Sequence, residues 1–237
     1  MSEPRRYLIV DDNQAFADNL AEILTDTGAA VDVASLGPEA LERVARTRYD
    51  ALISDMRMPV MGGAELVHRM RRLDPGLPAI VITAYTNDDD LAAARNEGLL
   101  AVLPKPAPLD RLLQMLASAR RSGLVALVDD DPDLLDNLTE VLRANGFAAV
   151  TASSVLETER LGDVAPFAAL VDLRVPGGAD GAAMSRLAAR FPGLPMLVVT
   201  GHSDQAPPEK YDTIFTKPFR TDHLMAAVER LYRSKHA

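Results

Sequence analysis

The sequence predicts two doubly wound α/β domains in tandem, each with a five-stranded parallel sheet covered by helices on both faces. Three observations lead to this prediction. The chain of 237 residues repeats a set of short motifs in one order. Within each copy, short apolar runs alternate with longer amphipathic ones, which is typical of a parallel sheet with crossover helices. Polar side chains gather where the apolar runs end.

The repeat indicates a duplicated domain. The acidic pair Asp11-Asp12 recurs as Asp129-Asp130, 118 positions later. Four further matches keep nearly this offset: DNL (18–20 and 136–138), ALISDMRMP (51–59) with ALVDLRVP (169–176), LPAIVITAY (77–85) with LPMLVVTGH (194–202), and LPKP (103–106) with FTKP (215–218). Each copy has the usual size of one domain. We therefore predict domains at 1–121 and 122–237, separated by a helix stop at Ser122-Gly123, where glycine can adopt the left-handed conformation.

The elements of the first copy follow from its hydrophobic periodicity. Apolar residues such as Phe16, Leu20 and Leu24 recur at helical spacing, whereas the strands are short continuous apolar runs. The predicted strands are Tyr7–Val10, Ala30–Ala34, Ala51–Ser54, Ala79–Thr83 and Ala101–Leu103. The predicted helices are Gln14–Thr27, Pro38–Thr47, Ala64–Leu73, Asp88–Glu97 and Leu109–Arg121.

Composition excludes several classes of protein. Hydrophobic residues make up 48% of the chain, which is enough for packed cores, yet no apolar run is long enough to span a membrane. A net charge of −9 argues against binding to the nucleic-acid backbone. Cysteine is absent and the N-terminus has no signal-peptide core. A cytoplasmic location is therefore expected.

The polar residues at the strand ends predict a phosphoryl-transfer site. Ligands of open parallel sheets bind at the carboxyl ends of the strands. There each copy gathers three carboxylates, a hydroxyl and an ammonium group: Asp11, Asp12, Asp55, Thr83 and Lys105, then Asp129, Asp130, Asp172, Thr200 and Lys217. Three carboxylates suit Mg²⁺, one Asp can attack phosphorus, and the other groups can hold the phosphoryl oxygens.

Both copies resemble the receiver domain of two-component response regulators, over essentially the whole chain. The resemblance implies a flavodoxin-like fold, with Asp55 and Asp172 as phosphoacceptors. It also implies that Thr83, Lys105, Thr200 and Lys217 contact the phosphoryl group and that both Lys-Pro bonds are cis. The Mg²⁺ ligands that it implies are Asp11, Asp12, Asp55 and the backbone carbonyl of Arg57, then Asp129, Asp130, Asp172 and the backbone carbonyl of Arg174.

Each of these residues has a structural alternative. An Asp after a strand often serves only as a helix N-cap, and this applies to Asp12 taken alone. Thr83 taken alone could bond to the backbone at a strand end. Lys105 taken alone could be a solvated loop cation. The recurrence of all five residue types in both copies favours the functional interpretation.

The sequence departs from the receiver pattern in two places. Val102 and Ile214 stand three residues before each Lys, where receivers usually carry a Phe or Tyr switch residue, so switching by ring rotation is in doubt. The segment from Thr200 to Lys217 is shorter than its counterpart and contains Pro207-Pro208. Because proline breaks helices, we expect the fourth helix of the second domain to be absent or reduced to one turn.

The predicted function is a response regulator with two receiver domains and no output domain. It would be phosphorylated by a histidine kinase or phosphotransfer protein and would signal to an unknown protein target, without nucleic acid, membrane or general enzymatic activity. A phosphate sink or relay is the alternative, which phosphotransfer to single Asp variants would distinguish. A phosphatase with an Asp nucleophile at the first strand is disfavoured by the duplication, and turnover of a phosphomonoester would support it.

Overall fold

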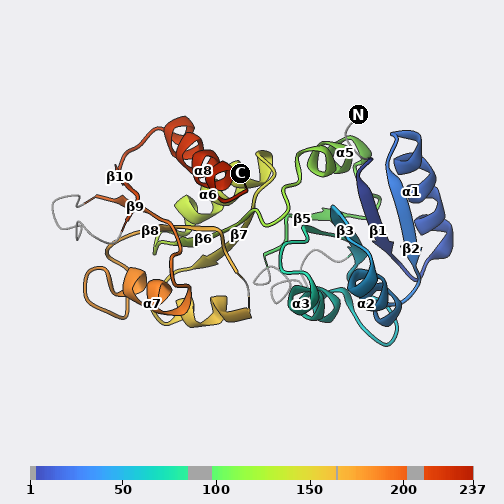
Figure 1. Ribbon diagram of the computed structural model, residues 1–237, viewed down its shortest axis with the longest axis horizontal. Helices are drawn as coiled ribbons and strands as arrows, with labels where there is room; N and C mark the ends of the chain where they lie inside the picture. Colours follow the sequence, from blue (N-terminus) through green and yellow to red (C-terminus); the bar gives the residue numbers. More distant parts are fainter. Residues whose placement is uncertain (1–3, 85–97, 164, 202–210, 237) are drawn as a thin grey trace. The chain divides into compact units, whose positions relative to one another are not determined.

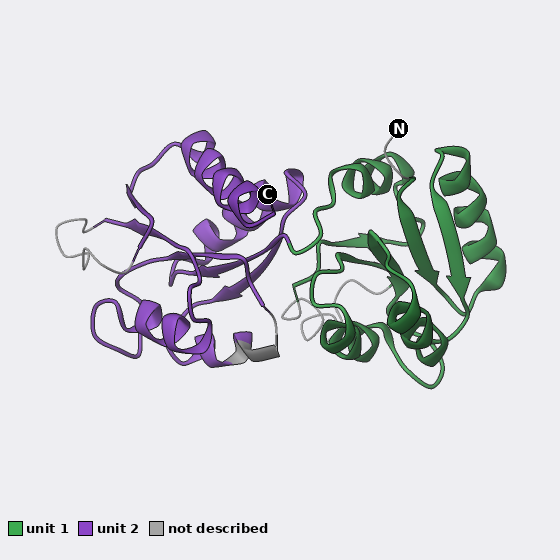
Figure 2. Ribbon diagram, viewed as in Figure 1, with its two compact units in different colours: residues 1–122 green, residues 123–237 purple. Residues whose placement is uncertain are grey.

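The chain divides into two compact units, Met1–Ser122 and Gly123–Ala237 (Figure 2). The computed structural model describes residues 4–84, 98–163, 165–201 and 211–236. The division between the units falls one residue after Arg121, where the sequence places the end of the first domain. No helix of the described residues is long and apolar enough to cross a membrane.

The first unit, domain one, is a five-stranded parallel sheet with helices on both faces (Figure 1). Its strand order is β2-β1-β3-β4-β5, which is the flavodoxin-like order. The elements are β1 Arg6–Val10, α1 Gln14–Asp26, β2 Ala30–Ala34, α2 Gly37–Arg46, β3 Ala51–Asp55, α3 Gly63–Leu73, β4 Ala79–Thr83, β5 Ala101–Pro104 and α5 Leu109–Ser118. The predicted fold class is confirmed.

The second unit, domain two, repeats this topology. Its sheet has the order β10-β9-β8-β6-β7, again entirely parallel. The elements are β6 Leu124–Val128, α6 Pro132–Ala144, β7 Ala148–Ala152, the 3₁₀ helix η1 Glu157–Asp163, β8 Ala168–Val171, α7 Ala182–Arg190, β9 Met196–Thr200, β10 Thr213–Thr216 and α8 Thr221–His236. One difference is that η1 takes the place of α2 of domain one.

Each sheet separates two apolar clusters, because successive side chains of a strand point to opposite faces. In β1, Leu8 and Val10 pack on the face covered by α2 and α3, whereas Tyr7 and Ile9 pack on the face covered by α1 and α5. In domain two, α7 and η1 cover one face, and α6 and α8 cover the other (Figure 1). Strands buried on both faces explain the continuous apolar runs of the sequence.

Helix α5 ends at Ser118, three residues before the predicted end at Arg121. Contacts with segments far away in the sequence determine where this helix ends. Arg5, from the start of the chain, donates hydrogen bonds to the backbone carbonyls of Leu116 and Ala119, at 2.6 and 3.2 Å. Arg121 instead forms hydrogen bonds to both carboxylate oxygens of Asp74, at 2.7 and 2.6 Å.

The residue with left-handed backbone between the units is Ser122, with φ 54°, and not Gly123 as predicted. The amide of Ser122 donates a hydrogen bond to the carbonyl of Gly76, at 2.7 Å. A contact to the rest of domain one therefore fixes this turn at a residue for which the conformation is less favourable.

The predictions for the fourth helix fall on residues that the structure does not describe. The predicted helix Asp88–Glu97 lies within residues 85–97, and the expected loss of its counterpart concerns residues 202–210. Strands β5 and β10, which follow these segments, are both in place.

Val60, in the loop between β3 and α3, has left-handed backbone with φ 69° and is 82% exposed. The corresponding residue of domain two is Gly177, with φ 94°.

A β-branched residue in this left-handed conformation costs about 1–2 kcal/mol. Asparagine tolerates the conformation better, so Val60→Asn should raise the free energy of unfolding of domain one by about 1 kcal/mol. Gly177→Val should lower that of domain two, and denaturant unfolding followed by domain-specific NMR signals measures both. A destabilised Val60→Asn variant would refute the assignment of strain.

Candidate functional site

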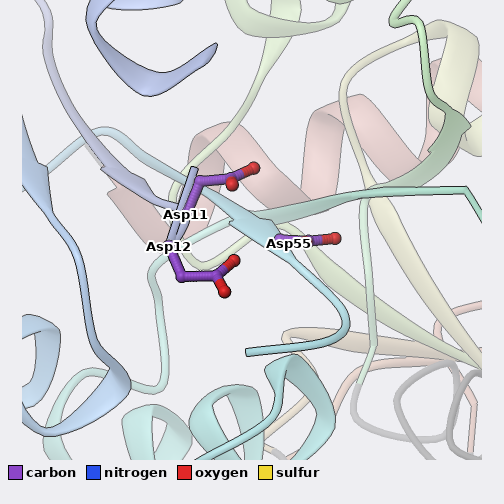
Figure 3. A group of neighbouring side chains, drawn as sticks. All are labelled: Asp11, Asp12 and Asp55. Atoms are coloured by element: carbon purple, nitrogen blue, oxygen red, sulfur yellow. The ribbon is translucent and has the colours of Figure 1, made fainter. Parts of the chain in front are cut away.

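The candidate site of domain one lies at the carboxyl ends of its strands. Asp11 and Asp12 follow β1, and Asp55 ends β3. Their carboxylate oxygens lie within 4.8 Å of one another, and Figure 3 shows the three side chains pointing to the same side. Thr83 ends β4, and its carbonyl accepts a hydrogen bond at 2.9 Å from the amide of Lys105, just after β5. The topology therefore brings all five predicted residues to one edge of the sheet.

The ammonium group of Lys105 bridges two of the carboxylates. Its Nζ lies 2.7 Å from Oδ2 of Asp11 and 3.0 Å from Oδ2 of Asp55. The side chain of Asp11 is 2% exposed and that of Asp55 is 12% exposed. Like charges disfavour one another's ionisation, and this cation offsets the repulsion between the two carboxylates.

Backbone amides orient the second oxygen of each bridged carboxylate. Oδ1 of Asp11 accepts from the amide of Asn13 at 2.9 Å, and Oδ1 of Asp55 accepts from the amide of Met56 at 2.7 Å. Asp12 is exposed. The N-cap of α1 is Asn13, so the alternative in which Asp12 serves as the cap is wrong.

Domain two builds the same arrangement. The carboxylates of Asp129, Asp130 and Asp172 form a second cluster within 4.8 Å. Nζ of Lys217 lies 2.6 Å from Oδ2 of Asp129 and 2.8 Å from Oδ2 of Asp172. Thr200 is buried at the end of β9, and its carbonyl accepts a hydrogen bond from the amide of Lys217 at 2.9 Å.

The remaining predictions concern residues around the two clusters. Both Lys105-Pro106 and Lys217-Pro218 are cis, as predicted. Arg57 and Arg174 lie on the surface, two residues after the third carboxylate of each cluster, and Nε of Arg174 forms an ion pair with Asp180 at 3.2 Å.

The aliphatic residues at the usual switch position pack inward. Val102 and Ile214 are partly buried and pack against the apolar clusters on the faces covered by α3 and α7. A ring that rotates between core and solvent is therefore not available at this position in either domain.

Phe16 lies next to the site. Its helical spacing in the sequence predicts only that it belongs to the apolar face of a helix. Nζ of Lys105 lies over its ring, 4.8 Å from the centroid. Apolar periodicity alone gives no signal for such a contact.

Burial and charge oppose one another at the two lysines. Burial lowers the pKa of Lys105, but the hydrogen bonds and charges of Asp11 and Asp55 outweigh it, so the pKa is raised above its ordinary value. The pKa of Lys217 is raised in the same way by Asp129 and Asp172. Burial also raises the pKa of Asp129, against the opposing effect of Lys217, while the charge of Asp172 adds to the increase. Both lysines are therefore cationic at neutral pH.

The raised pKa of Asp129 predicts that the stability of domain two depends on pH. A carboxyl group whose pKa is higher in the folded state binds its proton more tightly there, so its contribution to stability falls as the pH rises through that pKa. In metal-free protein, the stability of domain two relative to that of the Asp129→Asn variant should therefore fall as the pH rises above about 4, the ordinary pKa of an Asp. Urea unfolding at several pH values measures this difference. Asp130→Asn, at an exposed carboxylate, is the control, and a difference for Asp129→Asn that does not change with pH would contradict the prediction.

Comparison with known proteins gives matches over both units. The family model described as response regulator receiver domain matches residues 7–117 and 125–229. A response regulator receiver protein of Anaeromyxobacter sp. (strain Fw109-5) is 64% identical over 231 residues, covering 98% of this chain and 97% of that protein. The response regulator MprA of Mycobacterium leprae (strain TN) is 38% identical over 163 residues, covering 66% of this chain and 72% of that protein. A solved CheY-like receiver domain from Methanospirillum hungatei JF-1 is 30% identical, with a TM-score of 0.47, and covers 48% of this chain and 92% of that chain.

Proposed function

The chain belongs to the response regulator receiver family in both of its domains, and from this premise we propose that Asp55 and Asp172 each accept a phosphoryl group. The donor would be a histidine kinase or a phosphotransfer protein, and the output would be a change in binding to another protein. The observation that carries this proposal is the lysine that bridges two carboxylates at the strand ends of each domain.

Mg²⁺ fits both carboxylate clusters. A hard divalent cation prefers oxygen ligands, and each cluster offers three carboxylates within 4.8 Å. That a lysine ammonium group bridges two of them indicates that the pocket attracts a cation. The proposed ligands are Asp11, Asp12, Asp55 and the carbonyl of Arg57, then Asp129, Asp130, Asp172 and the carbonyl of Arg174. When bound, Mg²⁺ supplies positive charge next to the phosphoryl oxygens.

In domain one, different residues have different roles in the transfer of the phosphoryl group. A carboxylate oxygen of Asp55 attacks phosphorus and forms the new P–O bond, while the P–N bond to the donor histidine breaks and the imidazole leaves with its electron pair. The ammonium group of Lys105 and the hydroxyl of Thr83 hold the phosphoryl oxygens. Asp172, Lys217 and Thr200 have the same roles in domain two.

We expect millimolar Mg²⁺ to stabilise the protein, because binding to the folded state relieves repulsion within each cluster. At a free concentration of 100 times Kd, one site contributes about 2.7 kcal/mol. Thermal unfolding with and without Mg²⁺ measures the effect. The variant Asp11→Asn/Asp129→Asn should lose it, and an unchanged melting temperature for the wild type would count against both metal sites.

A small phosphodonor with Mg²⁺ tests the proposed function directly. Intact-mass spectrometry should show up to two added phosphoryl groups, which are labile in base and absent when a chelator replaces Mg²⁺. Protein that takes up no phosphate under these conditions would overturn the proposal. Turnover of a phosphomonoester without stable labelling would favour the phosphatase instead.

A phosphate sink is a second candidate function, because both domains contain the same bridged carboxylates and one donor could serve both. In a sink, one domain drains phosphate from the kinase while the other signals. Time courses of phosphotransfer from one kinase to Asp55→Ala and Asp172→Ala distinguish the two. A sink predicts rapid phosphate turnover at one domain, and signalling by both domains predicts a stable phosphate at each.

A further inference from the structure

Phe16 contacts the lysine of domain one with its aromatic ring. It is the third residue of α1 and is partly buried against the apolar cluster beneath that helix. Nζ of Lys105 lies 4.8 Å from the centroid of its ring. A cation at this distance from a ring face is attracted by the ring quadrupole.

The position of the ring is linked to the site by a closed set of contacts. Oδ1 of Asp11 accepts a hydrogen bond from the amide of Asn13 at 2.9 Å, and Oδ1 of Asn13 accepts one from the amide of Phe16 at 3.1 Å. Oδ2 of Asp11 accepts from Nζ of Lys105 at 2.7 Å. The same carboxylate thus fixes both the first turn of α1, which carries the ring, and the ammonium group over the ring.

Domain two has the same contacts without the ring. Oδ1 of Asp129 accepts from the amide of Asp131 at 3.1 Å, and Oδ1 of Asp131 accepts from the amide of Leu134 at 3.2 Å. Oδ2 of Asp129 accepts from Nζ of Lys217 at 2.6 Å. Leu134 is the third residue of α6 and stands where domain one has Phe16. Domain two therefore serves, within the same chain, as a comparison that lacks the ring.

We propose that Phe16 is a positioning residue whose ring face holds the ammonium group of Lys105 ready for the incoming phosphoryl oxygens. The proposal rests on the proposed function of the site. A lysine side chain has many rotamers, and ordering it costs conformational entropy. The ring attracts the ammonium group and offers it no oxygen as a competing acceptor. Lys105 therefore meets the phosphoryl group from an ordered position, whereas Lys217 is held by its two carboxylates without an aromatic ring at the corresponding helix position.

Three variants test the proposal. Phe16→Leu introduces the residue of domain two, Phe16→Tyr keeps a ring, and Leu134→Phe introduces a ring in domain two. With Asp172→Ala as background, Phe16→Leu should slow the phosphorylation of Asp55 by a small phosphodonor with Mg²⁺ by about two- to fivefold, and Phe16→Tyr should retain the rate. With Asp55→Ala as background, Leu134→Phe should accelerate the phosphorylation of Asp172 by a similar factor.

A second readout does not depend on phosphorylation. Protons over a ring face shift upfield in NMR spectra, so the ε-methylene protons of Lys105 should be shifted in the wild type and in Phe16→Tyr, but not in Phe16→Leu. Absence of this shift in the wild type would overturn the contact itself. An unchanged rate for Phe16→Leu, or equal slowing by Phe16→Tyr, would overturn the positioning role. Failure of the wild type to accept any phosphate would refute the proposed function, and the NMR shift would still decide whether the ring holds Lys105.

Discussion

Asp55→Asn is expected to remove one of the two phosphates that the protein accepts, Asp172→Asn the other, and the double variant both. The three carboxylates of each cluster are close together, so proximity alone does not select the acceptor. Exposure does. Asp11 and Asp55 each accept a hydrogen bond from a backbone amide and lie next to the ammonium group of Lys105. The side chain of Asp11, however, is 2% exposed, whereas that of Asp55 is 12% exposed.

The same comparison holds in domain two. The side chain of Asp129 is 6% exposed and that of Asp172 is 10% exposed, with Lys217 bonded to both. The exposed carboxylates Asp12 and Asp130 are open to a donor, but within the described part of the chain neither forms an ion pair with a lysine. Of the two carboxylates that contact each lysine, Asp55 and Asp172 are the more exposed, and the adjacent ammonium group can neutralise a phosphoryl oxygen.

Intact-mass spectrometry after incubation with a phosphodonor and Mg²⁺ counts the phosphates, and peptide mapping locates them. Asp110→Asn, at an exposed carboxylate in the first turn of α5, is the control and should retain two. Two phosphates on Asp55→Asn would show that another carboxylate is the acceptor in domain one.

The residues at the strand ends could be predicted because the end of a buried strand is visible in the local sequence. A buried strand is a continuous apolar run, so a polar residue such as Asp55 or Thr83 marks the end of it, and the duplication shows the same residues twice. Parallel topology then brings these ends together without any knowledge of the side-chain contacts. The bridging position of Lys105 follows from the same topology, because it comes directly after the strand that pairs with β4.

Features that depend on contacts between distant segments could not be predicted. The end of α5 is set by Arg5 and by the Arg121–Asp74 ion pair, which join segments far apart in the chain. The apolar periodicity of α1 is the same whether Phe16 packs only in the core or also under a lysine. For the same reason, the sequence gives no sign that one arginine of α3 is buried while its neighbour is exposed.

That buried arginine, Arg71, is expected to be a major source of stability in domain one. It is 3% exposed, and its guanidinium group donates to the carbonyls of Leu77 at 2.6 Å, Gly98 at 2.8 Å and Pro75 at 3.1 Å. These bonds tie the end of α3 to the start of β4 and to the turn that leads into β5. Burial of a cation is tolerated only when its donors are satisfied, and here carbonyl dipoles satisfy them. The corresponding residue of domain two is Ala188, which is exposed, so the second domain has the same topology without a buried arginine at this position.

Arg71→Met keeps most of the side-chain volume but leaves buried carbonyls without these donors, each at a cost of about 1–3 kcal/mol. We therefore expect the free energy of unfolding of domain one to fall by about 3–5 kcal/mol. Arg72→Met, at the exposed neighbour, should change it by less than about 0.5 kcal/mol. Arg71→Lys should give an intermediate loss, because one ammonium group cannot reach all three carbonyls as a planar guanidinium does. Urea unfolding followed by resolved NMR signals of each domain separates the effect on domain one from domain two, which should be unchanged. Equal effects of Arg71→Met and Arg72→Met would show that the carbonyl contacts contribute little, and that the stability of domain one comes from its apolar clusters alone.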